Sequence, residues 1–472
     1  MTQALWQLSA TELSARIAAR QTSARAATES VLARIDQINP RIKALASVSA
    51  ESALRAADAA DAAQARGQSL GPLHGVPVSI KINVDVQGEP TTEGVQGLAQ
   101  NIATQDSPLV QSLREAGAIL IGRNNAPAFS LRWFTDNAFC GRTLNPFDPR
   151  VTPGGSSGGA AAAVATGMGP IAHGNDYGGS VRYPAWACGV VGLRTTVGRI
   201  PSYKASGPNR MISNQQMSVQ GPLTRTVADA RLALQVMSRG SALDPQWMPV
   251  PLELPDHRAP TRVAVFRSWT HSPVDPTVSA AVDQAARWLE AAGYTVEEAE
   301  PPHFAEASAM QFAMVMNDMR RGGAPFMREH GDDALRQALA HYMLTQPEWD
   351  RDAYLEALTR RFSIARDWSV FFERYPLLLM PNSWERQFPI DDDQHSPERT
   401  AQMLLAQAPM LANAALGLPG LSVPTGVVNG LPVGVQLCAG KFREDRLLAA
   451  GEVIERAAQF SALAYLQAQH LA

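Results

Sequence analysis

The sequence VTPGGSSGGAAAAVATGMGPIAHGNDYGGSVRYPAWACGVVGLRTTVGRIP, residues 151–201, decides how the rest of the chain is interpreted. It contains two serine sites framed by glycines: Gly154–Gly159 is GGSSGG, and Asp176–Arg182 is DYGGSVR. Glycine permits backbone conformations and close approaches that other residues do not. The pattern predicts two serines built into the interior of a protein, which calls for a functional explanation.

The segment between the two serine sites is rich in alanine. Ala160–Gly167 predicts a helix that packs closely against its neighbours, because small side chains let elements approach each other. No charged residue occurs between Arg150 and Asp176, a feature that would also suit a membrane span. Gly, Ser and Ala dominate the run, however, and Pro170 interrupts it. We therefore interpret it as a buried globular segment.

The overall composition is that of an enzyme-sized globular protein. Of 472 residues, 45% are hydrophobic and 18% charged, and the formal net charge is −3. These values favour a large core over disorder, and they argue against a nucleic acid as a direct partner. Three cysteines outside any CxxC pattern and scattered histidines predict no metal or other cofactor and favour a reducing cytoplasm. The first residues do not resemble a signal peptide, and no membrane association is expected.

Helices and strands are expected on both sides of the central stretch. Periodicity and capping patterns predict helices at 10–20, 22–39, 49–66, 107–117, 278–292 and 445–457. Apolar and β-branched runs predict strands at 76–82, 118–122, 262–266, 294–298, 377–380, 421–423 and 433–437. Pro40 is expected to end the second helix, and residues 221–230 are expected to form a loop that runs into a helix.

Lys81 lies in the predicted strand at 76–82, between Ile80 and Ile82. An ammonium group in an apolar strand is costly unless it is paired or neutral. One interpretation is a lysine on an edge strand that faces water. The other is a buried amine whose pKa is low enough for it to accept a proton.

The second interpretation would provide the base that a serine nucleophile needs. The consecutive amides around Gly178, Gly179 and Ser180 suit an oxyanion hole, although either glycine–serine site taken alone is more often a turn. A phosphate-binding loop is disfavoured, since neither GxxxxGK[ST] nor GxGxxG after a strand is present. The histidines have no obvious triad context, but spacing alone leaves a histidine base open.

Taken together, these residues resemble the amidase signature enzymes. The hallmark of that family is Gly-Gly-Ser-Ser-Gly-Gly followed by Asp-x-Gly-Gly-Ser-x-Arg, with two functional serines 24 positions apart, the separation of Ser156 and Ser180 here. The resemblance covers about residues 25–240 and 413–457, and the second part contains the motifs GLP and GLPVGVQ. Several separate motifs in matching order make the resemblance specific.

The resemblance implies an α/β fold in a single domain, with a central twisted mixed β-sheet covered on both faces by α-helices. Residues 1–65 would form N-terminal helices and residues 66–240 the catalytic core. Residues 241–410 would form a variable segment around the substrate, and residues 411–472 would complete the core.

The resemblance also implies roles for individual residues. Ser180 would be the nucleophile, Ser156 a bridging serine on a cis peptide, and Lys81 the base. The oxyanion hole would consist of backbone N–H groups, those of Tyr177, Gly178, Gly179 and Ser180. Asp176 and Arg182 are expected to brace this loop rather than to take part in the chemistry.

The chain departs from the family pattern near the predicted site. Ile82 follows the lysine where Asp is usual, and Ala128 stands where Glu is common. Asn175 stands where Thr or Ser is frequent. None of these departures removes a member of the triad, but they are expected to reshape the substrate pocket.

Aromatic residues near the site suggest which substrate it prefers. Trp133 and Phe134 replace small residues of the family pattern. We expect both, together with Gly155 and Trp384, to contact the substrate and to favour an apolar or aromatic acyl group.

The leading functional prediction is a stand-alone amidase that hydrolyses a small-molecule carboxamide to a carboxylate and ammonia or an amine. The alternative is the glutaminase (A) subunit of a tRNA-dependent amidotransferase; the long irregular region and Gln407-Ala408-Pro409 argue against it. A catalytically silent scaffold is disfavoured because Lys81, Ser156 and Ser180 are all present. A homodimer remains open as the oligomeric state.

Overall fold

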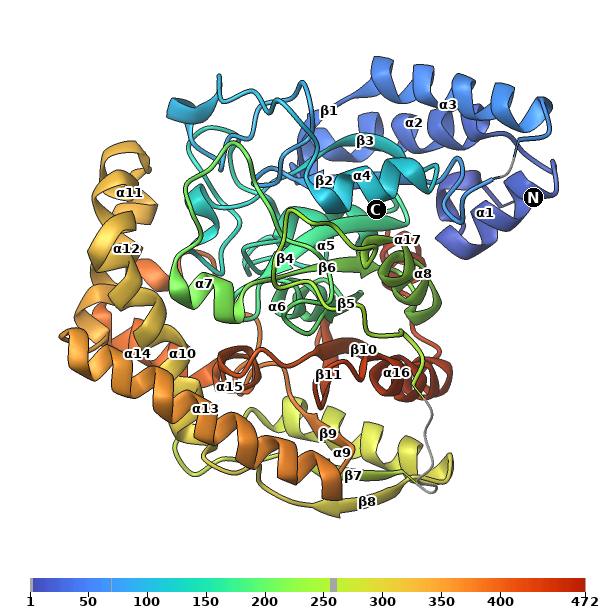
Figure 1. Ribbon diagram of the computed structural model, residues 1–472. Coiled ribbons are helices and arrows are strands. Elements are labelled where there is room, and N and C mark those ends of the chain that lie inside the picture. Colours follow the sequence, from blue (N-terminus) through green and yellow to red (C-terminus); the bar gives the residue numbers. More distant parts are fainter. Residues whose placement is uncertain (1–2, 69, 255–260, 472) are drawn as a thin grey trace.

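The computed structural model describes residues 3–68, 70–254 and 261–471, whose strands form a mixed sheet (Figure 1). The sheet has 11 strands in the order β1-β3-β2-β4-β6-β5-β10-β11-β9-β7-β8. Their bounds are β1 (Leu45–Val48), β2 (Pro77–Lys81), β3 (Ile119–Asn124), β4 (Ile171–Asp176), β5 (Val191–Arg194), β6 (Val219–Thr224), β7 (Arg262–Val265), β8 (Thr295–Glu298), β9 (Leu377–Met380), β10 (Gly420–Val428) and β11 (Leu431–Ala439).

Both strand directions occur in the sheet. β2 runs parallel to its neighbours β3 and β4, and β7 runs parallel to β8 and β9, whereas the other neighbouring pairs are antiparallel. The segments 1–65, 66–240, 241–410 and 411–472 each contribute at least one strand. The chain therefore forms a single-domain α/β fold, as expected.

The helices cover both faces of the sheet. Their bounds are α1 (Ala10–Ala18), α2 (Ala24–Ile42), α3 (Ala50–Ala65), α4 (Pro108–Glu115), α5 (Gly158–Ala165), α6 (Arg182–Ala187), α7 (Ile212–Met217), α8 (Val227–Met237), α9 (Pro276–Ala291), α10 (Phe304–Asp318), α11 (Ala324–His330), α12 (Asp333–Thr345), α13 (Arg351–Arg374), α14 (Pro397–Ala406), α15 (Ala408–Ala415), α16 (Glu444–Ala458) and α17 (Ala462–Ala468). Short 3₁₀ or π-helical turns are η1 (Leu5–Gln7), η2 (Gln96–Leu98), η3 (Ala128–Ser130), η4 (Met319–Gly323) and η5 (Asp392–Gln394). No described helix is long and apolar enough to cross a membrane.

Separate hydrophobic clusters hold the layers together. On one face, apolar residues of α4, α8, α9 and α16 pack against the sheet. On the other face, α2, α3, α5 and α6 form a second cluster with β3 and β4. Helices α10, α13 and α15 share an aromatic and methionine-rich cluster with β9, and α10–α14 gather at one side of the molecule (Figure 1). The burial of apolar surface in these clusters is the main favourable contribution to folding.

Most predicted helices and strands are confirmed to within a few residues. The prediction for residues 221–230 is wrong in its first part, because Val219–Thr224 forms strand β6, whereas the predicted helix does follow as α8 from Val227. Gly221 and Pro222 have low strand propensity, so local sequence did not indicate this strand. Pro222 lies opposite His173 in the ladder with β4, whereas the ladder between β6 and β5 contains only Leu223 and Thr224. Strands β1, β4 and β5 were also not predicted.

The prediction that Pro40 ends the second helix is also wrong. Helix α2 continues to Ile42, and Lys43 ends it in the left-handed conformation while its amide bonds the carbonyl of Asn39. Ile42 is buried in the cluster under α2, and this burial favours the extra turn. By contrast, the capping box of Ser9 and Glu12 at the start of α1 is confirmed.

Candidate active site

The predicted catalytic residues come together at the ends of central elements. Lys81 is the last residue of β2, Ser156 lies in the turn that precedes α5, and Ser180 lies between β4 and α6. The side chains of Lys81 and Ser156 are essentially inaccessible, whereas Ser180 keeps 9% of its surface exposed. Of these three residues, Ser180 is therefore the most accessible to a substrate.

The Lys81 amine lies within hydrogen-bond distance of three oxygen atoms. Its Nζ is 2.7 Å from Ser156 Oγ, 3.0 Å from Ser157 Oγ and 2.7 Å from Asn175 Oδ1. The interpretation of Lys81 as a water-facing lysine on an edge strand is wrong, because β2 lies between β3 and β4. The peptide bond between Gly155 and Ser156 is cis, as the resemblance implied.

Burial lowers the pKa of Lys81 from 10.5 to about 7. Desolvation of the ammonium is the main cause, and the negative charges of Glu93 and Asp176 oppose it. A large fraction of Lys81 is therefore neutral near pH 7 and is able to accept a proton.

The loop that carries Ser180 lies directly beside Ser157. The amide of Ser157 donates to the carbonyl oxygen of Ser180 at 3.2 Å. Among the described residues, no acceptor contacts the amides of Tyr177, Gly178 and Ser180. The amide of Gly179 instead donates to Asp176 Oδ1 at 2.8 Å. Gly179, whose amide was expected in the oxyanion hole, therefore has a structural hydrogen bond in this geometry.

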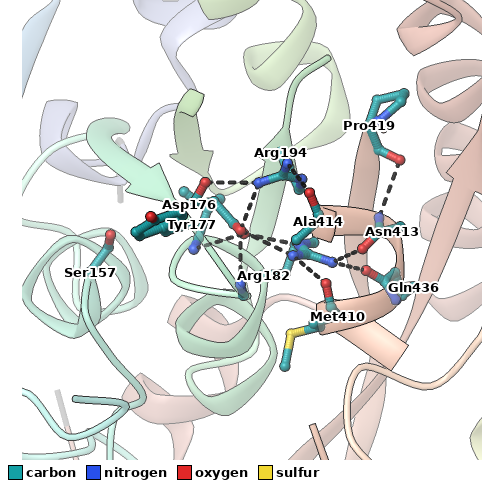
Figure 2. A network of polar contacts seen from close by, with 12 residues as sticks. Ser157, Asp176, Tyr177, Arg182, Arg194, Met410, Asn413, Ala414, Pro419 and Gln436 are labelled. Carbon is teal, nitrogen blue, oxygen red and sulfur yellow. Dashed lines mark hydrogen bonds and ion pairs between the residues drawn. The ribbon is translucent and has the colours of Figure 1, made fainter. Parts of the chain in front are cut away.

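A buried ion-pair network fixes this loop (Figure 2). Arg182 donates to both carboxylate oxygens of Asp176, at 2.9 and 3.0 Å, and Arg194 donates to Oδ1 at 3.0 Å. Burial alone would raise the pKa of Asp176, but the two guanidinium groups hold it well below its usual value. The expectation that Asp176 and Arg182 brace the loop is confirmed by these contacts.

The same network ties the loop to the C-terminal part of the chain. Arg182 Nη1 donates to Asn413 Oδ1 on α15 and to Gln436 Oε1 on β11, and Nη2 donates to the carbonyl of Met410 (Figure 2). No sequence motif indicated these roles for Asn413 and Arg194. Gln436 ends the GLPVGVQ motif, which was the available signal for its position.

Gly155 is where the loop before the first serine site meets the loop that contains Trp133. A Cβ atom on Gly155 would lie 2.4 Å from the carbonyl oxygen of Arg132 and 2.6 Å from the amide nitrogen of Phe134. The ring of Trp133 packs 6.1 Å from that of Phe312 on α10. The structure therefore places the backbone of residues 132–134 directly against Gly155 and directs Trp133 toward α10.

The other two aromatic candidates lie in different surroundings. Phe134 stacks on Phe388 at 6.3 Å. Trp384 is fully buried in a cluster with Phe266, Trp269 and Phe304, at centroid distances of 5.6, 6.4 and 6.4 Å. None of these aromatic partners is among the residues that contact the Lys81 amine, which are Ser156, Ser157 and Asn175.

A pocket of about 890 Å³ lies beside the loops that contain Trp133 and Gly178. It is bounded by α10, α13, α14, the segment before α13, the loop after β7 and Leu411 of α15. Its apolar lining includes Trp269, Met310, Phe312, Trp349, Leu404 and Leu411. Phe312 contacts Trp133, and the side chain of Leu411 lies 3.0 Å from the Cβ position of Gly178. Two residues that line the pocket, Phe312 and Leu411, therefore lie next to the loops that contain Trp133 and Gly178.

Comparisons with known proteins identify the family of this chain. The sequence profile of the Amidase family matches residues 26–448. Indoleacetamide hydrolase from Bradyrhizobium diazoefficiens is 41% identical over 456 residues, which cover 96% of this chain and 87% of that protein. The (A) subunit of glutamyl-tRNA(Gln) amidotransferase from Moorella thermoacetica is 34% identical, over 97% of this chain and 98% of its own.

A solved structure shows the same fold. A bacterial aryl acylamidase of the amidase signature family superposes with a TM-score of 0.85 at 26% identity, over 98% of each chain. The fold and these matches define an amide-hydrolysing enzyme. The chain belongs to the amidase signature family.

Proposed function

We propose that the protein hydrolyses a small-molecule carboxamide through an acyl-enzyme on Ser180, with Ser156 as relay and Lys81 as base. One observation carries the proposal: the Lys81 amine, with a pKa of about 7, lies 2.7 Å from Ser156 Oγ. A neutral amine in this position is the base that a serine hydroxyl needs in order to become a nucleophile.

In the first step, Ser180 Oγ attacks the amide carbon. Its proton passes to Ser156 Oγ while Ser156 gives its own proton to Lys81 Nζ. The negative charge on the carbonyl oxygen is stabilised by the amides of Tyr177, Gly178 and Ser180. The amide of Gly179 holds the loop through Asp176 instead.

In the second step, the C–N bond breaks and the nitrogen takes the proton back from Lys81 through Ser156. Ammonia or an amine leaves, and Ser180 remains as an ester. Water then attacks this ester with the same base, releasing the carboxylate and restoring the Ser180 hydroxyl.

We further propose that the acyl group is apolar or aromatic, with an aryl- or indoleacetamide as the leading class. The support is the apolar contact of Trp133 with Phe312 and the indoleacetamide hydrolase named among the relatives. Gly155, Phe134 and Trp384 remain proposed contacts of the substrate region. A cytoplasmic enzyme is consistent with three free cysteines, and the homodimer remains a proposal.

The test is product release by the purified chain from indole-3-acetamide, aryl amides and short aliphatic amides, with Ser180→Ala as the blank. We expect turnover that Ser180→Ala abolishes, and faster turnover of the aromatic amides. Turnover that survives Ser180→Ala would refute the mechanism. Equal rates on aromatic and short aliphatic amides would refute the acyl preference alone.

The second candidate function is that of the glutaminase in an amidotransferase complex. It is favoured by the 34% identity to the amidotransferase chain from Moorella thermoacetica over nearly the whole length. The two candidates differ in their need for partners. Hydrolysis of small amides by the isolated chain supports the first, and glutamine hydrolysis that appears only with added partner chains supports the second.

A further inference from the structure

We propose that Asn175 is a positioning residue: together with Ser157 it occupies both N–H groups of neutral Lys81 and so directs the lone pair of the amine at Ser156. This inference rests on the proposed function, because it concerns the same base. It explains why one of two neighbouring serines, and not the other, passes protons to the lysine.

The inference starts from the hydrogens of a neutral lysine. A neutral amine has two N–H groups and one lone pair, and Lys81 Nζ has three oxygen neighbours, on Ser156, Ser157 and Asn175. Two of these oxygens must therefore accept an N–H, and the third must belong to a hydroxyl that donates to the lone pair. The other contacts of each oxygen decide which role it takes.

Asn175 presents an oxygen that can only accept. Its Oδ1 faces Nζ at 2.7 Å, while its Nδ2 donates to Asn83 Oδ1 at 2.9 Å. Asn83 completes the pair, since its own Nδ2 lies 3.4 Å from Asn175 Oδ1 and 3.1 Å from Ser130 Oγ. The paired carboxamides hold the oxygen of Asn175 toward the lysine, and it takes the first N–H.

Ser157 takes the second N–H. Its hydroxyl hydrogen is directed to the backbone carbonyl of Asn175, at 3.4 Å, so its oxygen accepts from Nζ. Ser156 is then the remaining neighbour, and its hydroxyl donates to the lone pair of Lys81. With its hydrogen pointed at the lysine, the oxygen of Ser156 presents its own lone pairs to the proton of Ser180.

The lack of charge on Asn175 matters as much as its oxygen. A carboxylate at this place would stabilise the ammonium form and raise the pKa of Lys81, which would remove the base at neutral pH. The position after the lysine is also uncharged, because Ile82 is there and is buried. The chain thus orients the amine with a neutral acceptor, and Asn175 achieves this at a position where the family pattern has Thr or Ser.

The test measures the nucleophilicity of Ser180 without any amide. An alkyl fluorophosphonate phosphonylates an activated serine with loss of fluoride. The rate constant of this labelling is measured from pH 5 to pH 10 for the wild type and for three variants, Asn175→Asp, Asn175→Ala and Asn175→Thr. Asn175→Asp should shift the rise of the rate upward by about 1–3 pH units, with a plateau close to that of the wild type. Asn175→Ala should lower the plateau about tenfold or more, because the amine is no longer oriented.

Asn175→Thr keeps an oxygen beside Nζ and should recover most of the rate that alanine loses. The matched control is Gln64→Ala, which removes a partly buried amide on α3 that donates to the backbone carbonyl of Ile17. It should leave the profile of labelling unchanged. Thermal unfolding of each variant identifies any that do not fold, and the conclusion then rests on the folded members of the series.

Profiles of Asn175→Asp and Asn175→Ala that match the wild type would overturn the inference. A shift as large in Gln64→Ala would also overturn it, since the effect would not depend on contact with the lysine. Ser180→Ala must give no labelling. Absence of labelling in the wild type itself would instead overturn the proposed function, and this inference with it.

Discussion

The pH dependence of turnover is the sharpest consequence of the buried lysine. In the proposed mechanism only neutral Lys81 accepts the proton, and its pKa is about 7. With one controlling group at that pKa, the reactive fraction is about 10% at pH 6, about half at pH 7 and about 90% at pH 8. kcat/KM should therefore rise about tenfold from pH 6 to pH 8 and then level off.

The direction of the change distinguishes Lys81 from the buried histidine on β4. Burial lowers the pKa of His173 to about 3, so this residue is already neutral across the range and contributes no rise near pH 7. Replacement of the base by Lys81→Met should lower kcat by about 10²–10⁴-fold. The remaining activity should lose the rise between pH 6 and pH 8, because no amine remains to titrate.

The assay is the initial rate of amide hydrolysis in buffers of constant ionic strength. The matched control is Glu455→Gln on α16. Burial raises the pKa of Glu455 to about 7 as well, so this carboxyl group would titrate in the same pH range. Glu455 accepts a hydrogen bond from the amide of Val227 and lies far from the serines in sequence. This variant should keep the rise of the wild type. A rise that persists in Lys81→Met, or that disappears in Glu455→Gln, would refute the assignment of the base.

Three further predictions concern stability, backbone fit and selectivity. Asp176→Asn should lower the free energy of unfolding by about 3–5 kcal/mol, because it leaves the buried guanidinium groups of Arg182 and Arg194 without their negatively charged partner. Urea unfolding measures this change, and a loss below about 1 kcal/mol would contradict the prediction. Gly155→Ala should abolish activity, since its Cβ would lie 2.4 Å from the carbonyl oxygen of Arg132, whereas Gly322→Ala in η4, where that atom meets open space, should keep it. Trp133→Ala should lower kcat/KM for indole-3-acetamide about tenfold relative to acetamide, and an unchanged ratio would exclude Trp133 from the acyl site.

Local sequence was sufficient for those parts of the fold that depend on near neighbours in the chain. The capping box at Ser9 and the alanine-rich helix α5 follow from contacts within a few residues. The glycine–serine motifs identified Ser156 and Ser180 because the backbone there needs glycine at fixed positions. These features require no knowledge of what packs against them.

The tertiary structure decided which residues meet and how deeply they are buried. Lys81 could have faced water or the interior, and the place of β2 between β3 and β4 settled the question. Its contact with Ser156 joins residues 75 positions apart, and the contact of Arg182 with Gln436 joins residues 254 positions apart. Strand β6 and the surroundings of Trp384 were likewise set by distant partners.

The physical reason is the range of the interactions. Capping and helix periodicity act over three or four residues, so they can be predicted from the local amino-acid sequence. Desolvation, and the pKa shift that it produces in Lys81, depend on everything that excludes water from one point in space. Sequence thus determined which chemical groups this protein has available, and the order of strands in the sheet determined that Lys81 is buried beside Ser156, where we propose that it acts as the base.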